Sequence, residues 1–165
     1  MPSNYGKAFE ERLKEDWMKM DGATIDRLYD PVGGYVGVTN ICDFIGYKFP
    51  FIVYVECKSV KGNTFPFSNF KQFNKLICKK GIKGVLAGVV VWFYEKDVVL
   101  WCPIEEAERM INDGEKSINC KKVIEGTYNN RYNIKIIPSK KKRVFMESDY
   151  SVLFDCDYKE IVDGN

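Results

Sequence analysis

The N-terminal part of the chain has the hydrophobic spacing of an amphipathic helix. Phe9, Leu13 and Trp17 recur every four residues within residues 7–20, and charged side chains fill positions between them. A short polar residue before this segment can accept a hydrogen bond from an N–H group of the first helical turn. The sequence offers two such capping residues, Ser3 and Asn4.

The following segments have the composition of β-strands. Residues 25–29 predict a short strand, and residues 41–47 and 51–58 predict a hairpin connected by residues 48–50. The segment of residues 85–93 is almost wholly apolar and rich in valine, which is typical of a strand covered on both faces. The middle of the chain therefore predicts a sheet with one fully buried strand.

Two further helices are expected beside this sheet. Residues 67–80 predict a helix with Phe70, Phe73 and Ile77 on one face, followed by Gly81. Residues 97–102 predict a strand next to the apolar one, and residues 104–111 predict a third helix. This order of elements predicts an α/β sandwich, with a central mixed β-sheet flanked by helices.

Length and composition favour a single domain. A chain of 165 residues with 45% hydrophobic residues is long enough to bury its own core and too short for two ordinary domains. We expect the core within residues 3–115 and a C-terminal extension at residues 116–165. The extension has a weaker pattern, with a predicted strand at residues 132–137 and a possible helix start at residues 148–150.

The start of the chain has no recognisable targeting signal. Residues 1–7 lack the basic stretch and apolar core of a secretory signal, and no apolar run reaches the roughly 20 residues that a membrane helix needs. We therefore expect a protein that stays inside the cell, with no membrane partner. Its cysteines are then expected to be reduced.

The absence of histidine from the sequence restricts the possible chemistry. It excludes histidine-based nucleophilic triads, histidine general bases and histidine-ligated zinc. The six cysteines include no Cys-x-x-Cys pair, so a zinc site is not expected either. Catalysis would use carboxylates, lysine, tyrosine, cysteine or a metal ion held by oxygen atoms.

Charge is distributed in blocks. Residues 58–83 contain seven lysines and no acidic residue, and residues 116–143 have a net charge of plus eight, whereas the chain as a whole has a net charge of only +2. Both blocks also contain aromatic residues, and interleaved cations and aromatics suit a phosphate backbone with exposed bases. Solvated helix and loop surfaces are the alternative interpretation, and the phenylalanines could equally belong to the core.

A group of charged residues at the central hairpin can support chemistry. Glu56 and Lys58 lie two residues apart on a predicted strand and therefore project to the same face, and the hairpin can bring Asp43 beside them. Two carboxylates and a backbone carbonyl such as that of Cys57 form an oxygen site that Mg²⁺ or Mn²⁺ accepts. Such a site supports hydrolysis of a phosphodiester. A solvated strand end is the alternative for this motif taken alone.

Three segments taken together resemble the PD-(D/E)xK nuclease superfamily, and within it the RecU-type Holliday-junction resolvases of Gram-positive bacteria and their phages. They are NYGKAFE at residues 4–10, Asp43 with Glu56-Cys57-Lys58, and TFPFSNFKQ at residues 64–72. The resemblance covers roughly residues 3–81. It implies a restriction-endonuclease-like fold for this chain.

The resemblance also implies roles for individual residues. Asp43 and Glu56 would be the metal-ligating carboxylates, Lys58 the catalytic lysine, and Glu10 an acidic residue of the first helix that completes or supports the metal site. Gln72 matches a glutamine that flanks the active site of these enzymes, where it would position water or phosphate. Cys42 replaces the proline of the superfamily's motif.

The resemblance implies a Mg²⁺- or Mn²⁺-dependent endodeoxyribonuclease that makes paired nicks in four-way junctions during DNA recombination and repair. The expected protein is a homodimer in the bacterial cytoplasm, without an organic cofactor. The expected DNA contacts come from both basic blocks and from the glycine-rich segment between the first helix and Asp43. They are Lys61, Lys71, Lys75, Tyr35, Lys140, Lys141, Lys142 and Arg143.

That glycine-rich segment, residues 30–40, is shorter than the projecting stalk of RecU-type enzymes. An alternative to a junction-selective resolvase is therefore a restriction-like or repair nuclease that acts on flaps or duplex DNA. A second alternative is a DNA-binding protein without catalytic activity.

Overall fold

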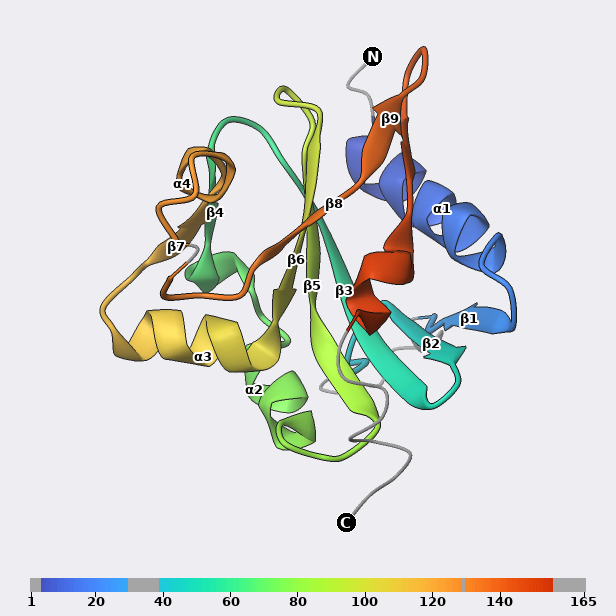
Figure 1. Cartoon of the computed structure of the whole chain (residues 1–165), viewed down its shortest axis with the longest axis horizontal. Coiled ribbons are helices and arrows are strands. Elements are labelled where there is room, and N and C mark those ends of the chain that lie inside the picture. The colour runs from blue at the N-terminus through green and yellow to red at the C-terminus, as the bar shows by residue number, and fades with distance from the viewer. Residues whose placement is uncertain (1–3, 30–38, 129, 156–165) are drawn as a thin grey trace.

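A six-stranded mixed sheet forms the centre of the computed structural model, which describes residues 4–29, 39–128 and 130–155 (Figure 1). The strands are ordered β1–β2–β3–β5–β6–β8, and only the β3–β5 pair is parallel. Their bounds are Ala23–Arg27 for β1, Phe44–Lys48 for β2, Phe51–Val60 for β3, Val85–Phe93 for β5, Val98–Pro103 for β6 and Lys135–Ile137 for β8. The predicted mixed sheet and central hairpin are confirmed.

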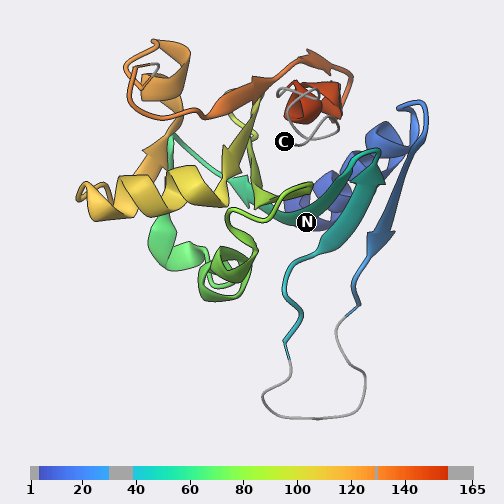
Figure 2. The ribbon, with the colours of Figure 1, turned by 60° about the horizontal axis from the view of Figure 1, so that its bottom comes forward.

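Helices cover both faces of this sheet (Figure 1 and Figure 2). Helix α1 (Tyr5–Met18) lies on one side, and α2 (Phe73–Leu76), α3 (Ile104–Asn112) and α4 (Cys120–Ile124) lie on the other. None of the helices in the described ranges is both long enough and apolar enough to cross a membrane. Two small ribbons complete the fold. They pair β4 (Thr64–Pro66) with β7 (Ser117–Asn119) and β9 (Ser139–Lys141) with β10 (Met146–Ser148).

Helix α1 forms as its spacing predicts. Phe9, Leu13 and Trp17 are buried, and the Asn4 side chain caps the helix by accepting a hydrogen bond from the N–H of Lys7 at 3.1 Å. Close packing against β2 depends on Gly46, because a Cβ atom there would lie only 2.5 Å from the Trp17 ring. A larger residue at this position would therefore push α1 away from the sheet.

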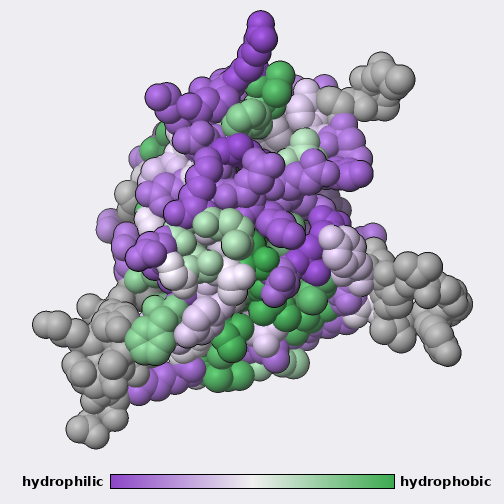
Figure 3. Space-filling view, turned by 90° about the vertical axis from the view of Figure 1, so that its right-hand side faces the viewer, coloured by the Kyte–Doolittle hydropathy of each residue, from purple (hydrophilic) through white to green (hydrophobic). Residues whose placement is uncertain are grey.

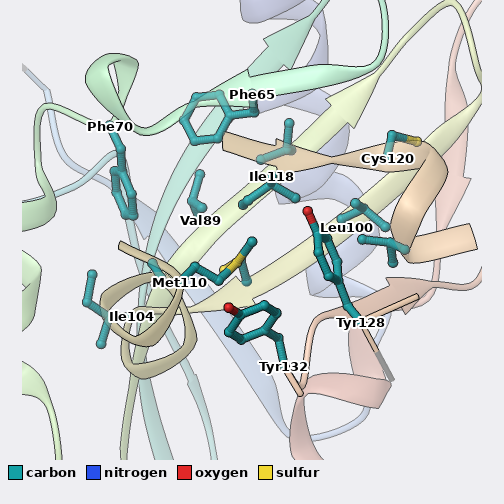
Figure 4. Packing of buried hydrophobic residues seen from close by; sticks show 14 of the residues in the cluster. Phe65, Phe70, Val89, Leu100, Ile104, Met110, Ile118, Cys120, Tyr128 and Tyr132 are labelled. Atoms are coloured by element: carbon teal, nitrogen blue, oxygen red, sulfur yellow. The ribbon is translucent and has the colours of Figure 1, made fainter. Parts of the chain in front are cut away.

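Strand β5 separates two hydrophobic clusters. Val89, Val91 and Phe93 face the side of α2 and α3, whereas Val90 and Trp92 face the side of α1. The strand is thus covered on both faces, as its apolar sequence predicts. The cluster on the α3 side includes Met110 with aromatic residues from several segments (Figure 4).

The predicted helix at residues 67–80 is wrong in extent. The chain forms a 3-10 turn at Phe67–Asn69, then α2, then a second 3-10 turn at Ile77–Lys79. Phe70 interrupts the helix because its ring is drawn into the core, where it lies 6.2 Å from the Phe65 ring. Burial of this side chain outweighs continuous helical hydrogen bonding, and only four residues form an α-helix.

Residues after 115 contribute to both hydrophobic clusters. Tyr128 and Tyr132 are buried on the α3 side, while Met146 and Tyr150 are buried on the α1 side. The predicted strand at residues 132–137 begins only at Lys135, because Tyr132 turns inward and donates a hydrogen bond to Asp113 Oδ2 at 2.7 Å. The possible helix start at residues 148–150 becomes a 3-10 helix, Tyr150–Phe154.

Candidate active site

The hairpin of β2 and β3 brings Asp43 beside Glu56. Asp43 immediately precedes β2, its N–H donates to Val55 O at 3.2 Å, and the register continues from the Phe44–Val55 pair. Its Oδ2 atom accepts a hydrogen bond from the N–H of Cys57 at 2.8 Å. The backbone therefore fixes one carboxylate next to the strand that carries the other.

Glu56 is a buried carboxylate with only one of its two oxygens hydrogen-bonded. Its side chain is 1% exposed, and Oε1 accepts a hydrogen bond from Lys58 Nζ at 2.7 Å. Its other oxygen, Oε2, is buried and has no hydrogen-bond partner in the structure. This contact confirms that Glu56 and Lys58 project to the same face of β3.

Burial raises the pKa of Glu56 to about 7, and the neighbouring negative charge of Asp43 adds to this effect, although Lys58 opposes it. Two carboxylates held together in a poorly solvated place repel each other and disfavour ionisation of one of them. A cation between them would relieve this repulsion.

The residues at this centre fit a divalent metal ion. The partnerless Oε2 atom of Glu56 and the neighbouring Asp43 carboxylate are hard oxygen donors, which Mg²⁺ and Mn²⁺ prefer. Cys57 directs its side chain into the cluster on the α1 side, so only its main chain could contribute to this site. Within the described ranges, no group of three or more His, Cys, Asp and Glu side chains is arranged to hold a metal ion. Backbone carbonyls or water would thus have to supply the remaining ligands.

Glu10, which the resemblance assigns to completing or supporting the metal site, is paired with Arg27 in the structure. It lies on α1 with its side chain 18% exposed and forms an ion pair with Arg27 of β1. This pair lines a hollow of about 690 Å³ along α1 that also contains two lysines, Lys7 and Lys14, and the exposed Tyr29. The structure therefore holds Glu10 in an ion pair on the α1 side, apart from the Glu56–Lys58 contact.

Gln72 lies just before α2. Its Oε1 atom is buried and has no hydrogen-bond partner in the structure. The predicted DNA contact Lys71 beside it is exposed, whereas Lys75 donates a hydrogen bond to Thr39 O at 2.6 Å. An orphaned amide oxygen is compatible with a role in holding water or a ligand, which stays a prediction.

The remaining predicted DNA contacts differ in whether their charge is already paired with an acidic side chain. Lys61, Lys141 and Lys142 form ion pairs with Glu95, Asp97 and Glu147. Lys140 and Arg143 are exposed and have no side-chain partner within the described ranges. Tyr35 lies outside the described residues.

Several aromatic residues of the basic blocks belong to the core. The rings of Phe65, Phe70, Tyr128 and Tyr132 are buried, so they are not available to stack on exposed bases. For the two phenylalanines, the alternative that they belong to the core is correct; the sequence analysis gave no such alternative for the two tyrosines. Lys7, Lys14, Arg27 and Tyr29, which line the hollow along α1 together with the predicted Glu10, were missed by the sequence analysis. Lys7 and Lys14 are two helical turns apart, a spacing that could have indicated that they share one face of the helix.

The cysteines in the described ranges are free thiols. Four of them, Cys42, Cys57, Cys102 and Cys120, are buried, while Cys78 is exposed. Burial raises the pKa of the Cys42 thiol to about 12, which disfavours the reactive thiolate.

Comparison with known proteins gives a structural match only. No established protein family matches the sequence, and no curated protein matches it. Among solved structures, the fold is similar to that of Hjc, a Holliday junction resolvase from the archaeal hyperthermophile Archaeoglobus fulgidus. The match has a TM-score of 0.50 and 21% sequence identity, and it covers 69% of this chain and 86% of that chain. The chain therefore has a mixed α/β fold of the kind found in that nuclease.

Proposed function

We propose that this protein is a metal-dependent endonuclease that cuts branched DNA, with the four-way junction as its main substrate. The observation that carries the proposal is the arrangement of Asp43, Glu56 and Lys58 at the central hairpin. Support comes from the fold, which is similar to that of a protein named as a Holliday junction resolvase. The motif resemblance to RecU-type enzymes of phages or Gram-positive bacteria agrees with the same function.

Asp43 and Glu56 would hold Mg²⁺ or Mn²⁺, together with a main-chain carbonyl such as that of Cys57. When bound, the metal ion would generate a hydroxide nucleophile near neutral pH and neutralise charge on the phosphate. The N–H of Cys57 fixes the orientation of the Asp43 carboxylate through their 2.8 Å hydrogen bond. A preoriented ligand loses less conformational freedom when the site is occupied.

Lys58 is the residue that acts directly on the substrate in this proposal. Its Nζ atom is held 2.7 Å from Glu56 Oε1, and its side chain is 30% exposed, so the ammonium group reaches solvent. From that position it would place a positive charge beside the attacked phosphate or orient the water. Gln72 would contribute a second polar group for the same task.

Glu10 would support the metal site after a change of partner. In the structure Arg27 neutralises its charge, and both side chains line the hollow along α1. A DNA phosphate that enters this hollow would compete with Glu10 for Arg27. Glu10 would then be free to help Asp43 and Glu56 hold the metal ion.

Binding of the DNA backbone would use the exposed lysines and arginines of both basic blocks. Residues 58–83 contribute seven lysines without an acidic residue. Affinity should therefore fall steeply with salt concentration, because each phosphate contact releases counterions. Paired nicks in a symmetric junction would require a homodimer with two active sites. Such an enzyme would act on DNA in the bacterial cytoplasm.

The proposed function is tested with a labelled immobile four-way junction and a linear duplex of matching sequence. Both are incubated with the protein in Mg²⁺, in Mn²⁺ and in chelator, beside the Asp43→Asn variant. Paired nicks on the junction alone, dependent on metal and lost in the variant, are expected. Equal cutting of both substrates would instead indicate a flap or duplex nuclease. DNA binding without cleavage under every metal would contradict an enzymatic function.

A further inference from the structure

An aromatic group lies at the end of β5, on the α1 side of the sheet. The Tyr5 and Tyr94 rings are stacked, with centroids 4.1 Å apart and planes inclined by 9°. Trp92 presents its ring edge-on to both tyrosines at 5.8 Å. These three residues form one continuous aromatic wall.

This wall lines a groove between α1 and the β9–β10 ribbon. The groove has a volume of about 460 Å³, within the range of sites that bind small organic groups. Its other wall contains Arg143 and Val144, which join β9 to β10. We call the hollow formed by Tyr5, Trp92, Tyr94, Arg143 and Val144 the aromatic groove.

The groove is accessible from solvent. The Val144 side chain is 79% exposed and Tyr5 is 38% exposed, so both can be reached by a ligand. Figure 3 shows the side of the molecule formed by α1 and the β9–β10 ribbon, where a small hydrophobic group lies among hydrophilic atoms near the top. An apolar surface surrounded by hydrophilic atoms suits a ligand that has a flat apolar part and a charged group beside it.

Charge and hydrogen-bonding capacity favour an anionic aromatic ligand. Arg143 has no ion-pair partner within the described ranges, while Lys141 beside it is neutralised by Asp97. The indole N–H of Trp92 is buried and has no hydrogen-bond partner in the structure. A nucleotide offers what these groups lack, because its base carries acceptor atoms and its phosphate carries negative charge.

The groove adjoins β3, the strand that carries Glu56 and Lys58, but it lies on the opposite face of the sheet from these two residues. Ser59, the residue after Lys58, pairs with Trp92 in the β3–β5 register, and its hydroxyl donates to Tyr5 O at 3.4 Å. Ser59 and Trp92 therefore lie on the strands that carry or adjoin Lys58. A DNA strand would have to pass around this end of the sheet to contact both the catalytic centre and the groove.

We propose that the aromatic groove binds one unstacked nucleobase of a DNA strand, with Arg143 on a neighbouring phosphate. This inference rests on the proposed function in one respect, namely that the protein binds DNA. Branched DNA supplies unpaired or weakly stacked bases at its branch point, whereas a continuous duplex does not. The groove would thus favour branched over linear substrates.

The test compares two fluorescent single-stranded oligonucleotides of equal length and charge, an oligothymidylate and its fully abasic counterpart. Binding of the full chain is measured in chelator, so that cleavage plays no part. The oligothymidylate should bind about tenfold more tightly or better, since stacking on aromatic side chains stabilises each base. Equal affinity for the two oligonucleotides would overturn the proposal.

Variants assign the preference to the groove. Tyr94→Leu should remove the preference for the oligothymidylate and leave affinity for the abasic strand unchanged. Tyr47→Leu is the matched control, because Tyr47 is also a partly exposed tyrosine, at 41%, and does not line the groove. Arg143→Ala should weaken binding of both strands and lower the salt slope by about one. A Tyr94→Leu variant that keeps the preference would contradict the assignment.

A second readout separates a folding defect from loss of the site. A 2-aminopurine base in the oligonucleotide should lose fluorescence when it stacks on the wild-type protein but not on Tyr94→Leu, with both proteins showing the same thermal unfolding. Cleavage of a four-way junction in Mg²⁺ is measured separately. If the protein cleaves the junction but shows no base preference, the role of the groove in base binding is refuted and the nuclease function stands. If it shows base preference but does not cleave, the nuclease function is refuted and the role of the groove stands. Failure to bind either strand would refute the groove, while the nuclease is judged by cleavage of the junction.

Discussion

Two buried carboxylates in this protein are treated in opposite ways. Asp16 on α1 is 2% exposed, and both of its oxygens are satisfied. Arg12 and Lys19 donate to Oδ1 at 2.6 and 3.2 Å, and the N–H of Ser148 donates to Oδ2 at 2.8 Å. Glu56 is equally buried but has Lys58 on one oxygen and nothing on the other. The same chemical group is thus fully paired in one region and incompletely paired in the other.

The difference distinguishes Asp16, whose charge is paired within the fold, from Glu56, which the proposed function assigns to metal binding. The partners of Asp16 come from α1 itself and from β10, so the carboxylate ties the C-terminal part of the chain to the first helix. A buried charge without full pairing costs folding free energy, which proteins accept at functional sites. In the proposed function, the incomplete pairing of Glu56 would lower stability and leave an oxygen available to a cation.

The largest expected effect concerns cleavage. Glu56→Gln and Asp43→Asn should each lower the rate of metal-dependent cleavage by at least about 100-fold, since metal coordination supplies several kcal/mol of transition-state stabilisation. Initial rates on a nicked-product gel measure this. Asp16→Asn is the control and should keep its activity below its unfolding temperature. A comparable loss in that control would abolish the distinction between the two carboxylates.

A large effect on stability is expected at Asp16. Asp16→Ala should lower the free energy of unfolding by about 3 kcal/mol, because it leaves Arg12 and the N–H of Ser148 without their buried partner. Urea denaturation followed by circular dichroism measures the change. Glu15→Ala is the matched control, since Glu15 pairs with the same arginine but is 65% exposed, and should cost less than about 1 kcal/mol.

At Glu56, substitution is expected to raise the free energy of unfolding rather than lower it. In chelator at pH 8, Glu56→Gln should raise the free energy of unfolding by about 2 kcal/mol, because a neutral amide replaces a buried charge beside Asp43. Added Mg²⁺ should stabilise the wild-type protein and not the variant. Thermal unfolding with and without Mg²⁺ checks both statements. Destabilisation by Glu56→Gln in chelator would show that Glu56 is a structural residue like Asp16.

The smallest expected effect is that the stability gained through Glu56→Gln depends on pH. The pKa of Glu56 is raised to about 7 in the folded protein from 4.5, so the folded state holds this proton more tightly than the unfolded chain. Its stabilising contribution is complete below pH 4.5 and is lost as the pH rises through about 7. In chelator, the advantage of Glu56→Gln over wild type should therefore grow across this interval. An advantage that does not vary with pH would contradict burial of an ionisable Glu56.

Much of the fold could be predicted because periodicity records which faces are apolar. The valine-rich β5 agrees with its prediction at both ends, and α1 differs by two residues at each end. The segment around Phe70 could not be predicted in this way. Its aromatic spacing fits a helix equally well, and only contact with Phe65 decides that the chain breaks there.

The candidate site also has features that the local sequence pattern predicts and features that only tertiary contacts decide. Alternation along a strand was sufficient to place Glu56 and Lys58 on one face, and hairpin pairing brought Asp43 beside them. The partner of Glu10 could not be inferred, because Arg27 lies 17 residues away and reaches α1 only through the packing of β1. The aromatic groove escaped prediction for the same reason, since its walls come from three separate segments.

The sequence alone determined helix α1, strand β5, the mixed sheet and the position of Glu56 and Lys58 on one face of β3. Those features depend on interactions between neighbouring residues and on the alternation of side chains along a strand. Tertiary structure decided which charges are paired, since Asp16 meets Ser148 across 132 residues of chain while Glu56 keeps one oxygen free. The reason is that hydrogen bonds and burial depend on distances in space, which a one-dimensional pattern does not contain.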